Sequence, residues 1–314
     1  MKLVFMGTPE FAVPSLKTLA EAHQVVGVIT APDKPAGRGK KILKSAVKEV
    51  AEELGLHVLQ PTNLKNPEFL KELESLEADL FVVLAFRMLP ESVWSMPARG
   101  TINLHASLLP DYRGAAPINR AIMNGESKTG LTTFFIEKEI DTGMIIDQVE
   151  MLIGAEEDAG MLHDRMMDKG AELLLSTVNK IEKKEVKPIP QKPAGELKQA
   201  PKIFKEDCEI DWSHSTAEVH HHIRGLSPYP TAWTIAAGVD FPEQSFKIYQ
   251  SRIAEFKIAG QHGSILLTDE LRLFVKCDDG ALEIIELQVP GKKRMKTTDF
   301  LRGFRSPIDF RFHK

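Results

Sequence analysis

Short apolar runs alternate with stretches of helical periodicity along the first 150 residues. Four β-rich runs predict strands over Lys2–Met6, Gln24–Thr30, Leu80–Leu84 and Thr101–Leu104. Elsewhere apolar residues recur every three or four positions, which predicts helices over Pro14–Ala22, Ser45–Leu54 and Pro67–Leu76, with Ser45 and Asn66 as N-caps. This alternation predicts an α/β fold with a Rossmann-like open, mostly parallel sheet and helices on both faces. Ligands of such sheets gather at the carboxyl ends of the strands.

The pattern changes after residue 130. Leu131–Ile136 and Met144–Met151 predict a strand pair around a polar turn, and a long helix is expected over Ala159–Glu182. Residues 183–205 are rich in Pro and Lys and cannot sustain a helix. The runs after them predict a small OB-like β-barrel, with strands over Ser245–Tyr249, Ser264–Leu267, Leu271–Lys276 and Ala281–Gln288. We therefore expect an α/β domain at 1–183, a basic linker at 184–206 and a C-terminal β-barrel domain at 207–314.

Composition narrows the class of protein. A chain of 314 residues with 43% hydrophobic and 27% charged residues is typical of two ordinary globular domains. The two cysteines, Cys208 and Cys277, lie far apart and fit no metal-ligand or disulfide pattern. The sequence begins with a β-rich run in place of a targeting signal, and no stretch is apolar enough to span a bilayer. We expect a cytoplasmic monomer without a metal site.

Positive charge is concentrated in three segments although the net charge is −4. Residues 33–48 hold six Lys or Arg against one Asp, residues 180–205 hold eight Lys against three Glu, and residues 291–314 hold eight Lys or Arg against two Asp. Each segment alone is most simply a solvated surface. Together they favour a polyanionic partner that binds particular faces.

Two apparent motifs and one cysteine do not indicate a functional site. The opening VFMGTPEF has one glycine where a dinucleotide-binding fingerprint needs three, which disfavours a nicotinamide-dependent oxidoreductase. The run His220, His221 and His222 cannot converge on one metal ion, because consecutive helical residues point about 100° apart. Cys208 has acidic neighbours, which disfavour a reactive thiolate.

The most informative stretch is GTINLHASLLPDYRGAAPI at 100–118. Asn103 and His105 lie two residues apart at the end of a predicted strand, so their side chains leave the same face. An amide and an imidazole there could polarise a carbonyl oxygen and hold it as it becomes an oxyanion. A structural pair is the simpler interpretation of Asn-x-His alone. The Pro- and Gly-punctuated loop that follows suits the wall of a pocket, which favours a site.

This stretch resembles the formyltetrahydrofolate-dependent formyltransferases. The similarity extends over GTPEFAVPSL near the start, PDKPAGRGKK, ASLLPDYRGAAPI, the turn IDTG, IDWSHSTAEVHHHIRGLSPYPTAW and GKKRM. Tyr112 and Tyr229 depart from the pattern, which has Trp at these positions. The resemblance implies a catalytic Asn103, His105 and Asp141, a formyl donor, 10-formyltetrahydrofolate, and formyl transfer to the methionine amino group of initiator methionyl-tRNA without a metal.

The resemblance also implies the binding residues. Two walls of the folate site are expected at Ser107, Leu108, Leu109 and Pro110, and at Phe86, Arg87, Met88 and Leu89, although the second loop differs from the commoner Tyr-Gly-containing one. Contacts with tRNA are expected from Arg38, Lys40, Lys41, Lys292, Lys293 and Lys296. The basic segments and the barrel favour tRNA over the ribonucleotide and sugar acceptors of other family members. A non-catalytic RNA-binding module is a further alternative, which the intact trio disfavours.

Overall fold

The chain forms two compact units in the computed structural model. The structure describes residues 1–36, 41–192, 195–238, 241–303 and 310–313. Residues 1–114, 129–151 and 163–199 form the first unit, and residues 115–128, 152–162 and 200–314 form the second. Residues 115–128 and 152–162 therefore belong to the second unit although both lie before residue 183, whereas the sequence predicted domains that are continuous in the chain.

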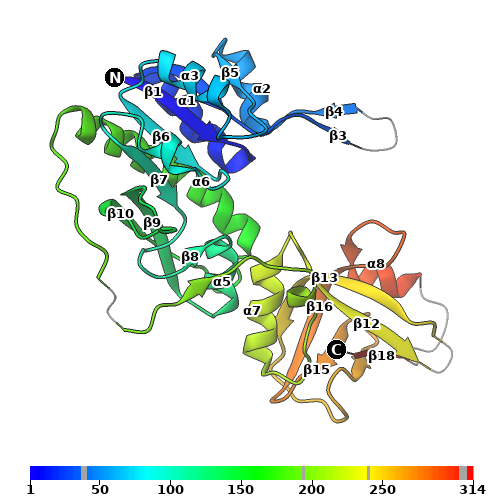
Figure 1. The fold of residues 1–314 in the computed structure, drawn as a ribbon. Coiled ribbons are helices and arrows are strands. Elements are labelled where there is room, and N and C mark those ends of the chain that lie inside the picture. Colours follow the sequence, from blue (N-terminus) through cyan, green and yellow to red (C-terminus); the bar gives the residue numbers. More distant parts are fainter. Residues whose placement is uncertain (37–40, 193–194, 239–240, 304–309, 314) are drawn as a thin grey trace. The chain divides into compact units, whose positions relative to one another are not determined.

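The first unit is built on a seven-stranded sheet with the order β10-β9-β7-β6-β1-β2-β5 (Figure 1). Neighbouring strands from β5 to β7 are parallel, and β9 runs antiparallel to β7. Strand order reverses between β1 and β6, where ligands of open sheets bind. The predicted Rossmann-like fold is confirmed. The bounds are β1 (Lys2–Gly7), β2 (Gln24–Ile29), β5 (Val58–Leu59), β6 (Leu80–Leu84), β7 (Thr101–His105), β9 (Lys128–Phe135) and β10 (Ile145–Leu152).

Helices bury the sheet because their apolar residues recur on one side. Phe69 and Leu73 of α3 pack with Val4, Met6 and Phe81 in one buried cluster. The helices and 3-10 turns of this unit are η1 (Glu10–Ala12), α1 (Val13–Ala22), α2 (Ala46–Glu53), α3 (Pro67–Ser75), α4 (Glu91–Trp94) and, from His163 onward, α6 (Ala159–Glu182). No helix in the described ranges is both long and apolar enough to cross a membrane.

Local sequence signals set the helix ends. The Ser45 side chain accepts a hydrogen bond from the Lys48 N–H at 3.1 Å, and the Asn66 side chain accepts one from the Glu68 N–H at 2.8 Å, so both predicted N-caps are confirmed. Each bond satisfies a backbone donor that the first helical turn leaves free. The 159–182 helix also has its predicted bounds.

The second unit is a nearly closed antiparallel barrel, as predicted. Its strand order is β14-β15-β16-β13-β12-β18, with β17 beside β16. The Phe312 N–H donates to the Gly263 carbonyl at 3.0 Å across the closure. A side chain at Gly263 would lie 1.9 Å from the Phe312 carbonyl oxygen, so the close approach requires glycine. The strands are β12 (Ala232–Gly238), β13 (Gln244–Ile253), β14 (Ile265–Leu267), β15 (Leu273–Lys276), β16 (Ala281–Gln288), β17 (Met295–Lys296) and β18 (Phe310–His313).

Several elements were not predicted from the sequence. Helix α7 (Thr216–Leu226) begins with a capping box between Ser215 and Glu218 and packs on the barrel (Figure 1). Further unpredicted elements are η1, β5, α4 and β17, whose bounds are given above, and β3 (Lys34–Ala36), β4 (Lys41–Leu43), β8 (Arg113–Gly114), α5 (Pro117–Met123), β11 (Gln199–Ala200), η2 (Glu206–Cys208) and α8 (Thr297–Arg302). Strands β12 and β18 lie side by side although they are far apart in the chain, and no local pattern encodes that pairing.

Candidate active site

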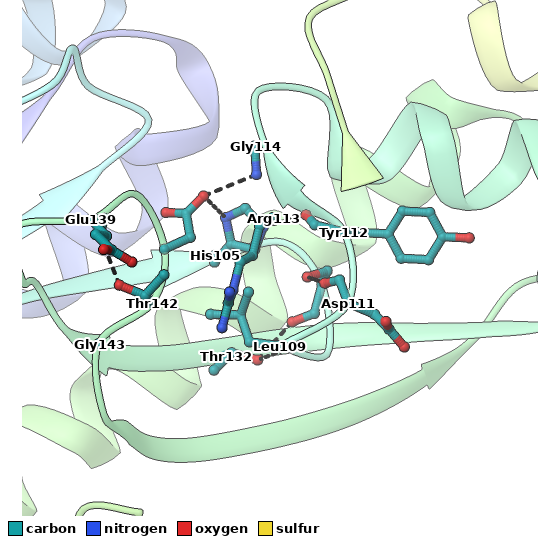
Figure 2. A network of polar contacts seen from close by, with 12 residues as sticks. His105, Leu109, Asp111, Tyr112, Arg113, Gly114, Thr132, Glu139, Thr142 and Gly143 are labelled. Atoms are coloured by element: carbon teal, nitrogen blue, oxygen red, sulfur yellow. Dashed lines mark hydrogen bonds and ion pairs between the residues drawn. The ribbon is translucent and has the colours of Figure 1, made fainter. Parts of the chain in front are cut away.

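His105 is held at the carboxyl end of β7 by contacts on both ring nitrogens (Figure 2). Its Nε2 lies 2.8 Å from the Tyr112 carbonyl oxygen. A carbonyl only accepts, so Nε2 is the donor and carries a proton. Nδ1 faces Asp141 Oδ2 at 3.8 Å. The side chain is buried, and the structure thus brings together two of the three predicted catalytic residues.

Asp141 lies in a turn that the surrounding backbone fixes. Its φ of 54° is left-handed, a conformation that Asp tolerates better than most residues. The Gly114 N–H donates to Asp141 Oδ2 at 3.0 Å. After the turn, Gly143 approaches β9 so closely that a Cβ would lie 1.7 Å from the Phe135 carbonyl oxygen. Both contacts constrain where the carboxylate can lie.

The loop that follows β7 is tied to the neighbouring strands. The Thr132 hydroxyl donates to the Ser107 carbonyl at 2.7 Å and accepts from the Leu109 N–H at 3.1 Å. The Gln148 amide donates to the Leu109 carbonyl and to the Thr132 hydroxyl, both at 2.9 Å. The predicted folate wall at Ser107–Pro110 is therefore a rigid loop next to His105.

Asn103 precedes His105 by two residues on β7. It pairs with Val83 of β6 on one side and with Phe134 of β9 on the other. Its side chain is half-buried, and among the residues the structure describes its amide has no hydrogen-bond partner. An amide donor and an imidazole thus leave the same face at the end of one strand, an arrangement suited to binding a developing oxyanion.

Comparison with known protein families identifies the family of this chain. Residues 1–178 match the family model for formyl transferases, and residues 202–305 match the model for the formyl transferase C-terminal domain. The chain belongs to the formyl transferase family.

Relatives of similar length support the assignment. Two proteins named methionyl-tRNA formyltransferase, from Bacteroides fragilis and Flavobacterium johnsoniae, are each 50% identical to this chain. The first alignment covers 97% of this chain and 95% of the relative, and the second covers 96% of each. An N-formyltransferase from Helicobacter canadensis, solved with folinic acid and dTDP-3-aminofucose, shares the fold with a TM-score of 0.66 at 22% identity, over 90% of this chain and 98% of that one.

The second predicted folate wall, Phe86–Leu89, lies in the loop that follows β6. Arg87 donates to the Thr62 carbonyl at 3.0 Å and also to the Pro61 carbonyl, so its guanidinium ties this loop to the segment after β5. Leu89 is buried in an apolar cluster, whereas Met88 is 73% exposed. Met88 is therefore the most exposed apolar side chain of this loop, whereas Phe86 is partly buried against the same cluster as Leu89.

The predicted tRNA contacts lie in two regions. Lys292, Lys293 and Lys296 are exposed around β17 of the barrel. Nearby, the Arg294 guanidinium lies 4.5 Å from the ring centre of Tyr249 and donates to Glu286 at 2.6 Å. Arg38 and Lys40 lie outside the described residues, as does the side chain of Lys41.

Sequence reasoning missed four groups that shape this site. They are the Tyr112 carbonyl, the Gly114 N–H and the side-chain amides of Gln148 and Gln191. The first two are backbone atoms, which carry no residue-type signal. Gln191 lies among Pro and Lys residues in the predicted linker, where one amide forms no recognisable pattern.

The three consecutive histidines of α7 face different surroundings. His220 is buried with its Nδ1 3.1 Å from the Ser251 hydroxyl, whereas His221 lies against Gly125. No cluster of three potential metal ligands occurs among the described residues. Burial, followed by nearby Asp207, raises the pKa of the Cys208 thiol, the direction expected from its acidic neighbours.

These histidines predict acid sensitivity of the second unit. Burial lowers the pKa of His220, His221 and His222, so the folded state keeps them neutral at a pH where the unfolded chain binds protons. The free energy of unfolding should therefore fall as pH drops below about 6.5, by at most about 1.4 kcal/mol per pH unit for His220. Urea unfolding of wild type and His220→Asn between about pH 7.5 and pH 5.5 tests this. An equal fall in both proteins would contradict it.

Proposed function

We propose that this formyl transferase moves the formyl group of 10-formyltetrahydrofolate onto the α-amino group of methionine on initiator tRNA. The observation that carries the proposal is the His105–Asp141 pair at the end of β7, beside an Asn103 amide that has no partner among the described residues. The names of relatives that are 50% identical over nearly the whole chain support the acceptor.

The side chains suit attack by an amine on a formyl carbonyl. An α-amino group ordinarily has a pKa of about 7.7, and this pKa falls when the neighbouring carboxylate is esterified to tRNA, so much of the amine is neutral near pH 7 and needs little activation. The harder task is to stabilise the oxyanion, to which the Asn103 amide can donate. Since the Tyr112 carbonyl keeps a proton on Nε2, a second proton on His105 must lie on Nδ1, beside Asp141. Asp141 would support that positive charge and, through a water, pass the proton from the amine to the departing nitrogen.

The residues present fit a folate donor. Ser107–Pro110 would hold it from the side of β7, and Phe86 with Met88 would hold it from the side of β6. The folate supplies the formyl group, and the protein binds, orients and shields it. All these residues come from one chain, so the proposal needs no second copy. Charged tRNA is a cytoplasmic substrate, and the proposal places the reaction there.

Acceptor choice tests the proposed function. Full-length protein would be incubated with 10-formyltetrahydrofolate labelled in the formyl group and, separately, with charged initiator tRNA, charged elongator methionine tRNA, or an amino-sugar nucleotide. Label is expected in the methionine of charged initiator tRNA. Preferential labelling of the amino sugar, or no transfer to any charged tRNA, would contradict the proposal.

The folate wall makes a separate prediction. Gln148→Met removes the hydrogen bond to the Leu109 carbonyl and the one to the Thr132 hydroxyl, which itself binds the 107–110 loop, while keeping the length of the side chain. A looser loop should raise KM for the folate donor by about 10-fold with a smaller change in kcat, since each lost bond is worth about 1 kcal/mol. Steady-state kinetics measure this, and an unchanged KM would place the donor elsewhere.

The exposed lysines of the barrel predict a salt-dependent affinity. Lysines that neutralise phosphates release counterions, so log K for tRNA should fall with log salt by about 0.7 to 0.9 per neutralised phosphate. Reversing Lys292, Lys293 and Lys296 to Glu should flatten this dependence and weaken binding of all tRNAs alike. Filter binding across a salt series measures the slope. An unaltered slope would make these lysines ordinary solvated surface.

A further inference from the structure

The side-chain amide of Gln191 makes four hydrogen bonds beside the candidate active site. Its Nε2 donates to the carbonyl oxygens of Asp141 at 2.8 Å and Gly143 at 2.9 Å. Its Oε1 accepts from Arg113 Nε at 3.1 Å and from Nη2 at 2.6 Å. Both donors and the acceptor of the amide are thus used, which is more than a solvated linker residue requires.

These bonds form one network with the hydrogen bond that holds the Asp141 carboxylate. The Gly114 N–H holds Asp141 Oδ2, and the preceding residue, Arg113, holds Gln191, which in turn holds the Asp141 carbonyl. The side chain and the main chain of Asp141 are therefore both tied to residues 113–114. This matters because the left-handed backbone at Asp141 costs energy and persists only where its surroundings fix it.

The segment that carries Gln191 is itself fixed to this unit. Ile189 and Ile145 exchange two backbone hydrogen bonds, of 2.8 and 2.9 Å. Further along this segment, the Lys198 carbonyl accepts a hydrogen bond from the Tyr112 N–H at 2.7 Å. Tyr112 is also the residue whose carbonyl contacts His105. The predicted linker thus contacts the backbone on both sides of the His105–Asp141 pair.

We propose that Gln191, held by Arg113, is a positioning residue that sets the Asp141 carboxylate opposite His105. The proposal rests on the catalytic role of Asp141 in the proposed function. It gives the segment before the barrel a part in catalysis besides that of connecting two units. Neither Gln191 nor Arg113 needs to touch either substrate for this effect.

Two Gln191 variants test the role. Gln191→Met keeps the side-chain length and removes all four bonds, whereas Gln191→Glu keeps an acceptor for Arg113 and removes both donors. Each should lower kcat by about 10-fold or more and leave KM for folate and for charged tRNA within about twofold, because a displaced carboxylate impairs the reaction and not binding. The exposed Gln24 provides a matched control, and Gln24→Met should retain full activity. Thermal unfolding should show that all variants are folded.

A double-mutant cycle with Asp141→Asn separates the possible outcomes. If Gln191 acts through Asp141, Gln191→Met should cause little further loss of kcat in the Asp141→Asn background. The inference would be overturned if the kcat losses of Gln191→Met and Asp141→Asn multiplied in the double variant. A normal kcat in both Gln191 variants, or a change in KM alone, would also overturn it, and the proposed function would still stand. A normal kcat in Asp141→Asn alone would overturn the proposed role of Asp141, and this inference with it.

Discussion

His105→Ala is expected to lower kcat for formyl transfer by about 100-fold or more, because it removes the imidazole that faces Asp141 two residues after Asn103 and that would carry the positive charge beside the oxyanion. Binding of the folate donor and of charged tRNA should change little, since the ring contacts the protein through Tyr112 and Asp141. Single-turnover transfer of labelled formyl, with binding measured separately, gives both quantities.

His57→Ala is the matched control for this variant. His57 is exposed, 52% for its side chain, and its Nε2 lies 3.4 Å from Glu72 at the surface. Its replacement should leave the transfer rate at the wild-type value. A His105→Ala protein that is folded, binds both substrates and transfers formyl at a near-normal rate would contradict the catalytic assignment.

Gly143→Ala is expected to have the second-largest effect. The added Cβ would lie 1.7 Å from the Phe135 carbonyl oxygen, so the turn that carries Asp141 must move. Overpacking of this kind costs about 1–3 kcal/mol of stability, and a displacement of about 1 Å at a catalytic group can cost about 100-fold in rate. Unfolding by urea and steady-state kinetics measure the two effects.

Gly195→Ala provides a comparison for this substitution. No atom lies within 4 Å of the Cβ that it would add, so stability and kcat should both stay near the wild-type values. A Gly143→Ala protein as active and as stable as Gly195→Ala would contradict the role of the turn in placing Asp141.

The parallel sheet could be predicted because its signals are local. Continuous apolar runs in β1 and β6 and capped amphipathic helices such as α2 each follow from a few neighbouring residues. The position of Asn103 and His105 at a strand end follows from the same pattern. Strand β18 gave no such signal, because its pairing with β12 depends on residues far away in the chain.

The site could be predicted only in part. Asp141 came from resemblance alone, because its approach to His105 depends on a turn that lies far along the chain. Gln191 contacts that turn from 50 residues further on, and no period or spacing marks it. Contacts made by backbone atoms, such as the Tyr112 carbonyl, cannot be predicted from residue types either, because every residue has a carbonyl. The sequence therefore predicts which side chains could carry the chemistry, but it does not predict the hydrogen bonds that hold them in place.

The most direct test of the account is the single-turnover rate of formyl transfer to charged initiator tRNA in Asn103→Ala, in His105→Ala and in the double variant. Residues that act as one unit are not additive, so the double variant should be about as slow as the slower single variant, about 100-fold or more below wild type. Losses that multiply, or a double variant that transfers formyl at the wild-type rate, would contradict a single catalytic unit at the end of β7.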